Sequence, residues 1–150
     1  MPDRKERSTA EPLEFVEATK RYPGAGVFDL HTVAGERRMI GDVLLECELE
    51  LGARRTLAGF ENHAGRTRLG AGEAPLGRVL KGHGNTGTSG AEGVRRGSVI
   101  GTYLHGPLLP KNAWFADWLI RRATGLDELE ALDDTLEDAA HAEARRAAGV

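Results

Sequence analysis

Apolar and polar residues alternate through the middle of the chain, a pattern that is typical of β-strands with one buried face. Together with the glycine-rich turns between its segments, the pattern predicts strands over residues 26–32, 38–50, 56–60, 77–81 and 98–104. Before the first strand, residues 1–25 predict a charged tail that includes at most a short helix, which ends at Pro23-Gly24. The domain is therefore expected over residues 26–150.

The period of the apolar positions changes after residue 112 to that of amphipathic helices. Asn112 is the predicted N-cap of a first helix, and Gly125 is its predicted stop. The apolar face of this helix is expected to consist of Phe115, Trp118, Leu119 and Ala123. A second helix is predicted from Asp127 to about Ala147, with an apolar stripe of Leu129, Leu132, Leu136 and Ala139.

Charge and composition exclude several classes of function. The formal net charge of −3 is spread over the chain without a basic stripe, so neither nucleic acid nor an anionic membrane is an expected partner. No apolar run is long enough to span a bilayer, and the polar N-terminus does not resemble a signal peptide, so we predict a cytoplasmic protein without membrane insertion. The five histidines are widely spaced and there is one cysteine, so neither a metal nor another cofactor is predicted.

One glycine motif invites a nucleotide interpretation that its context does not support. Gly82, Gly84 and Gly87 form a G-x-G-x-x-G pattern. A dinucleotide site needs this pattern between a strand and the start of a helix, whereas TSGAEGVRRG follows here and predicts a turn. We therefore expect a glycine-rich connection between strands.

His105 differs from the other histidines in its surroundings. It follows the predicted strand at residues 98–104, and ligands of open α/β sheets bind beyond the carboxyl ends of strands. Gly106-Pro107 allows a sharp turn that frees the imidazole. From position alone, His105 is either a catalytic base or a structural residue at a strand end.

Four segments together resemble the C-terminal half of class I glutamine amidotransferases of the cobyric-acid-synthase-like (CobB/CobQ) type. They are GFENHAGRT (residues 59–67), PLGRVLKGHGN (75–85), Glu92-Gly93 and GTYLHGPLLPKN (101–112). The last segment is most similar to the glutaminase subunits of lipid II isoglutaminyl synthases. The resemblance implies an α/β fold, with a three-layer, flavodoxin-like or Rossmann-like sheet and C-terminal helices.

The resemblance also implies a reaction and a partner. In this family a cysteine thiolate attacks the side-chain amide of glutamine and a histidine, matched by His105, transfers protons. The released ammonia passes to an ATP-dependent, Mur-ligase-like subunit, which amidates the D-glutamate of lipid II in peptidoglycan synthesis. Pro107 occupies the position where many class I relatives have a glutamate, so an orienting acid would have to come from elsewhere.

The nucleophile of the family lies in a strand-to-helix elbow that this sequence lacks. The one cysteine, Cys47, lies in an alternating strand pattern between two glutamates, which would raise a thiol pKa, so we expect a structural role for it. We therefore expect an inactive chain that lacks the N-terminal half of the domain. Two further hypotheses remain open: a cobyric-acid-synthase-like amidotransferase domain, and a non-catalytic module that binds a partner.

Four more residues are candidates for substrate binding. Asn62, His63 and Arg66 are expected in a polar loop after the strand at 56–60, although turn formation alone could explain two of them. Arg38 matches a basic position of the family and could hold a substrate carboxylate or simply be solvated. Of Trp114 and Trp118, we expect one in the core and one available to a partner subunit.

Overall fold

The computed structural model describes residues 26–50 and 53–150, and the predicted tail and short helix lie outside the described residues. The elements follow one another as β1 (Leu30–Glu50), β2 (Ala53–Leu69), β3 (Gly77–Lys81), β4 (Ala91–Glu92), β5 (Val94–Arg96), β6 (Val99–Gly101), α1 (Ala113–Thr124) and α2 (Thr135–Ala148). The predicted change from strands to helices after residue 112 is confirmed.

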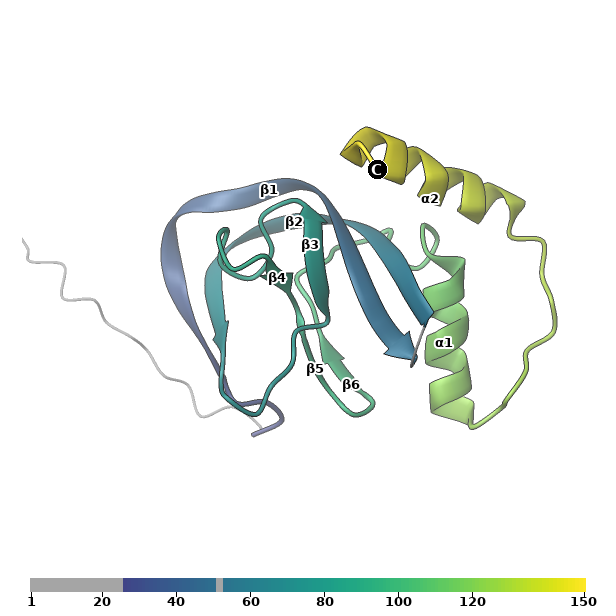
Figure 1. Cartoon of the computed structure of the whole chain (residues 1–150), viewed down its shortest axis with the longest axis horizontal. Helices are drawn as coiled ribbons and strands as arrows, with labels where there is room; N and C mark the ends of the chain where they lie inside the picture. Colours follow the sequence, from purple (N-terminus) through teal and green to yellow (C-terminus); the bar gives the residue numbers. More distant parts are fainter. Residues whose placement is uncertain (1–25, 51–52) are drawn as a thin grey trace, which may run out of the picture.

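A long curved ribbon of two antiparallel strands, β1 and β2, runs across the molecule (Figure 1). Their pairing extends from Leu30 opposite Leu69 to Glu50 opposite Ala53, with an irregularity between Ala34 and Met39. The predicted break between strands 26–32 and 38–50 is therefore wrong, and so is the short strand 56–60. Gly35 does not form a turn. It leaves space for the Arg66 side chain, because a Cβ at residue 35 would lie 2.6 Å from Cζ of Arg66.

The four-stranded sheet has the order β2-β1-β3-β4, and β5 and β6 form a separate two-stranded sheet. Each strand pair formed by the described residues is antiparallel. A sheet and two helices agree with the expected α/β class at this level. The three-layer, flavodoxin-like arrangement stays a prediction. Such a sheet contains neighbouring parallel strands, and the strand pairs of the described residues are antiparallel.

The core lies between one face of the ribbon and α1. Alternate residues of β1, namely Val43, Leu45, Cys47 and Leu49, point into the core. There they form one hydrophobic cluster with Leu57, Leu76, Leu104, Phe115 and Trp118. Glu46, Glu48 and Glu50 occupy the intervening positions, where Glu46 and Glu48 form ion pairs with Arg54. The alternation predicted for this strand thus holds from Leu45 to Glu50, whereas Leu44 on the opposite face is also buried.

Helix α1 matches its prediction at both ends, but by a different capping interaction. Gly125 ends the helix in the left-handed conformation (φ 73°), and its N–H donates to the carbonyl of Arg121. Asn112 occupies the N-cap, yet its side chain does not cap the helix. The Asn112 amide instead exchanges two hydrogen bonds with the backbone of Ala58 (2.9 and 2.8 Å) and donates a third to the carbonyl of Leu108.

Helix α2 begins at Thr135, so the prediction of a helix from Asp127 is wrong. Asp133 competes for the backbone there, because its carboxylate accepts the N–H of Thr135 at 3.1 Å. The predicted leucine stripe is also wrong: Leu132 is 77% exposed and Leu136 80% exposed.

Polar contacts attach α2 to the rest of the domain. His141 contacts the hydroxyl of Thr56 through Nε2 (2.8 Å) and the carbonyl of Lys111 through Nδ1 (2.8 Å). The side chain of Lys81 also donates to the carbonyl of Ala147 near the end of the helix. Neither helix of the described part has the length and apolar content needed to cross a membrane.

The core and α2 should respond differently to the loss of a leucine side chain. Leu45→Ala removes a fully buried side chain, and we expect it to lower the free energy of unfolding by about 2–5 kcal/mol. Leu136→Ala on α2 is the control and should change it by less than about 0.5 kcal/mol. Urea denaturation of both variants measures the difference, and equal losses would contradict the described core.

Candidate functional site

His105 is exposed and lies four residues after the end of β6. Its backbone N–H donates to the carbonyl of Phe60 on β2 at 2.7 Å, which forms an isolated antiparallel bridge. The predicted strand 98–104 is therefore too long. We expected His105 at the carboxyl end of a strand in an open α/β sheet. In the described residues, the strand before it, β6, instead pairs antiparallel with β5. The side chain itself is accessible, as a proton-transfer residue requires.

Arg38 and Asn62 form a pair on exposed positions of β1 and β2. The Arg38 guanidinium donates to Oδ1 of Asn62 and to its backbone carbonyl, both at 2.9 Å. Asn62 lies two residues after Phe60, and alternate residues of a strand share a face. The pair is thus on the same face of β2 as the residue that bridges to His105.

The side chain of His63 is buried. Residues 62–66 belong to β2, so the prediction of a polar loop there is wrong. The ring Nδ1 lies 3.0 Å from the carbonyl of Gly65, which can only accept, so Nδ1 carries a hydrogen. Nε2 lies 3.4 Å from Oε2 of Glu61, a contact that becomes an ion pair when the ring is doubly protonated. The ring also stacks on Tyr103, with centroids 3.7 Å apart.

Arg66 holds backbone rather than presenting its guanidinium to solvent as a free group. Its Nη1 donates to the carbonyl of Ala64 at 3.1 Å, and its Nη2 donates to the carbonyl of Arg37 at 2.8 Å. These bonds span the irregularity in the pairing of β1 with β2. Substrate binding by Arg66 would compete with this structural role.

The glycine motif of residues 82–87 forms a turn around a carboxylate of the same chain. The N–H groups of His83 and Gly84 donate to Oε1 and Oε2 of Glu61 at 2.6 and 3.0 Å. Glu61 is 1% exposed. Two of the N–H groups that a phosphate would need are thus already used, which agrees with the predicted connection between strands.

A second buried carboxylate, that of Glu92, lies behind the segment that leads to His105. Its Oε1 accepts the N–H of Tyr103 at 2.7 Å, and the hydroxyl of Thr102 lies 2.9 Å from both carboxylate oxygens. Burial raises the pKa of Glu92 from 4.5 to about 7 against the lowering effect of these hydrogen bonds, and the charge of Glu61 adds to the increase.

Cys47 is buried in β1, where its thiol lies 3.6 Å from the carbonyl of Arg55. Burial raises the pKa of this thiol to about 11; the charge of Arg95 lowers it and that of Glu46 raises it. A thiolate is the reactive form of cysteine, so this position disfavours nucleophilic attack. The geometry agrees with the structural role expected for Cys47.

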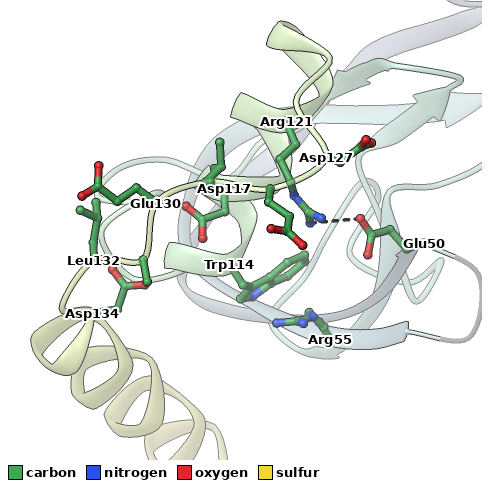
Figure 2. Close-up of a pocket in the computed structure, with 12 residues that line it drawn as sticks. Glu50, Arg55, Trp114, Asp117, Arg121, Asp127, Glu130, Leu132 and Asp134 are labelled. Carbon is green, nitrogen blue, oxygen red and sulfur yellow. Dashed lines mark hydrogen bonds and ion pairs between the residues drawn. The ribbon is translucent and has the colours of Figure 1, made fainter.

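A groove of about 450 Å³ lies away from these residues, between the end of β1, α1 and the segment that precedes α2 (Figure 2). Trp114 is among its lining residues, as are Arg121 and Glu50, which form an ion pair at 3.2 Å (Figure 2). Trp114 is half-buried and Trp118 is 2% exposed, so Trp118 is in the core as expected of one tryptophan.

His105 bridges to Phe60 of β2, two residues before Asn62, which pairs with Arg38 of β1, whereas His63 and Arg66 are engaged in structural contacts. Glu61 and Glu92 both lie in segments that resemble the family, but the sequence analysis identified neither as a candidate site residue. The only feature that could have drawn attention to either residue is a glutamate within a segment that otherwise predicts turn or strand. The sequence does not indicate that either carboxylate is buried.

Known proteins provide an independent comparison. The sequence profile of the CobB/CobQ-like glutamine amidotransferase domain matches residues 7–113. Subunit GatD of lipid II isoglutaminyl synthase (glutamine-hydrolyzing) is 40% identical over 67% of this chain and 39% of its own length in Staphylococcus aureus, and 40% identical over 81% and 48% in Streptococcus pneumoniae. A probable cobyric acid synthase of Methanothermobacter thermautotrophicus is 38% identical over 74% of this chain and 23% of its own. The chain thus spans less than half the length of these relatives.

The buried thiol should react slowly while the protein is folded. At about pH 8, a pKa two units above the ordinary value lowers the thiolate fraction about 100-fold, and burial slows alkylation further. Iodoacetamide labelling followed by mass spectrometry should show slow modification of Cys47 in buffer and rapid modification in urea. As a control, Ser98→Cys in a Cys47→Ser background places a thiol on an exposed position and should react rapidly in both conditions. Rapid labelling of folded Cys47 would contradict its burial.

Glu92 should make stability depend on pH. Between about pH 4.5 and 7 the folded chain holds a proton that the unfolded chain releases, so the free energy of unfolding should fall as pH rises, by up to about 3 kcal/mol. Urea denaturation across this range should show a shallower decrease for Glu92→Gln. The matched control is Glu143→Gln on exposed α2, which should keep the wild-type slope. Parallel slopes for wild type and Glu92→Gln would refute the assignment.

Proposed function

This chain belongs to the CobB/CobQ-like glutamine amidotransferase family, and we propose that it provides the histidine-bearing part of a glutaminase site. His105 is the proposed proton-transfer residue. The observation that carries the proposal is the exposed imidazole of His105 on a backbone fixed to Phe60, within the GTYLHGPLLPKN segment that resembles the family. The pair formed by Arg38 of β1 and Asn62 of β2 is proposed to bind the substrate glutamine. His63 and Arg66 already make structural contacts, His63 with the carbonyl of Gly65 and Arg66 with the carbonyls of Ala64 and Arg37.

The proposed reaction needs a thiolate that Cys47 does not supply. A cysteine thiolate attacks the amide carbon of glutamine, and His105 passes a proton to the departing nitrogen, which leaves as ammonia. Water then hydrolyses the thioester and releases glutamate. The pKa and burial of Cys47 argue against this role, so we propose that the nucleophile comes from a segment outside these 150 residues and that the chain by itself does not hydrolyse glutamine.

The proposed role of the ammonia is amidation of the D-glutamate of lipid II by a Mur-ligase-like, ATP-dependent partner subunit in the cytoplasm. The names of the two relatives at 40% identity support this assignment. The three-layer sheet expected of the family would then be completed by the segment that carries the nucleophile. The cobyric acid synthase relative at 38% identity supports a second candidate, an amidotransferase domain that supplies ammonia for cobyric acid synthesis.

The decisive experiment measures glutamate release from glutamine by this chain combined with the cysteine-bearing segment that completes the amidotransferase domain. His105→Ala should lower kcat by about 100-fold or more, the usual scale of general acid–base catalysis, without loss of folding. His31→Ala, at another exposed histidine of the sheet, is the matched control and should leave kcat unchanged. Full turnover by His105→Ala would overturn the proposal. Glutamine-dependent amidation assays with lipid II or with a cobyric acid precursor, each with its partner ligase, separate the two candidate pathways.

A further inference from the structure

The backbone segment before His105 forms hydrogen bonds with a side chain, where a strand segment would ordinarily form them with the backbone of a neighbouring strand. β6 ends at Gly101, and the chain pairs again only at His105. Between these points, the N–H of Tyr103 donates to the Glu92 carboxylate. The N–H of Leu104 donates to the hydroxyl of Thr102 at 3.0 Å, and that hydroxyl in turn donates to the same carboxylate.

We propose that Glu92 is a positioning residue that fixes the backbone carrying His105. The proposal rests on the function proposed above for His105. The carboxylate acts through two neighbours of the histidine in the chain, and it fixes them from β4, an element paired to β3 in the main sheet. The backbone around His105 is thereby bonded to that sheet at two points: at Phe60 on β2 and at Glu92 on β4.

The surroundings of Glu92 make this link sensitive to protonation. The carboxylate is 1% exposed, and its pKa of about 7 means that both forms are populated near neutral pH. The titratable groups that face it are Glu61, whose charge opposes its ionisation, and Tyr103, whose hydroxyl contacts Thr67 instead at 2.6 Å. An ionised Glu92 only accepts hydrogen bonds, whereas a protonated Glu92 has a hydrogen to donate and changes the role of the Thr102 hydroxyl.

Two substitutions separate the parts of this role. Glutamine keeps an oxygen that can accept the N–H of Tyr103, but it does not titrate. Alanine removes the acceptor and leaves that N–H without its present partner. Glu92→Gln should therefore preserve the position of His105 and abolish its dependence on pH, whereas Glu92→Ala should lose both.

The test follows the backbone amides and the His105 ring by NMR spectroscopy of the full chain between about pH 5 and 9. His105→Gln identifies the ring signal by its disappearance. In a His105→Gln background, where position 105 has no ionisable ring, the amides of Tyr103, Leu104 and residue 105 should shift together with a midpoint near pH 7, and this shared step should be absent when Glu92→Gln is added. The ring signal of His31 on β1 is the control and should be the same in both proteins.

Hydrogen exchange provides the second measurement. In Glu92→Ala, the His105 amide should exchange at least about tenfold faster, while the amide of Leu45 in the ladder of β1 keeps its protection. The proposal is overturned if Glu92→Gln in the His105→Gln background keeps the shared step near pH 7, and this criterion holds even where Glu92→Ala does not fold. Equal acceleration of the His105 and Leu45 amides would also overturn it, because that result indicates global destabilisation alone.

These spectra report on Glu92 and His105 whether or not the chain takes part in glutamine hydrolysis. The loss of kcat in His105→Ala tests the proposed function separately. A normal shared step with full activity of His105→Ala would refute the function and leave the positioning of the backbone intact. The reverse result would refute the role of Glu92 alone.

Discussion

Buried backbone N–H and C=O groups need hydrogen-bond partners, and this requirement governs the parts of the domain outside the strand ladders. Among the residues that the structure describes, the buried side chains of Glu61, Glu92, Asn85 and Asn112 help to meet it. Glu61 accepts from the turn at residues 82–87, Glu92 from the segment before His105, and Asn85 exchanges two hydrogen bonds with Gly93. Asn112 does the same with Ala58. The irregular segments around the candidate site are thus fixed by side chains that reach them from elsewhere in the sequence.

This arrangement explains which elements could be predicted. Local pattern was sufficient for α1, because the spacing of Phe115 and Trp118 and the glycine at its end all act within one helix. It was also sufficient for β3 and for the alternation around Cys47. It failed at residues 127–134, where an apolar spacing suited to a helix was present, but the side chain of Asp133 bonds the backbone and starts the helix later.

The candidate site was predictable only in part, for a related physical reason. The resemblance to the family pointed to His105, and the structure adds its bridge to Phe60. The glutamates and asparagines that fix the surrounding backbone are polar, and polar residues ordinarily predict exposed positions. Apart from the bond of Asn112 to Leu108, their partners lie 8 to 54 residues away in the chain, as for Asn85 with Gly93 and Asn112 with Ala58. Sequence patterns within one element carry no information about such pairings.

The contacts of His141 give the C-terminal helix an attachment that tolerates a change of charge. Nδ1 faces the carbonyl of Lys111 and must carry a hydrogen in either state of the ring. Nε2 faces the hydroxyl of Thr56, which can donate to a bare nitrogen or rotate and accept from a protonated one. Addition of a proton to Nε2 therefore reverses the direction of one hydrogen bond and breaks neither. The two contacts of His141 thus attach α2 to β2 and to the segment before α1 in either state of the ring.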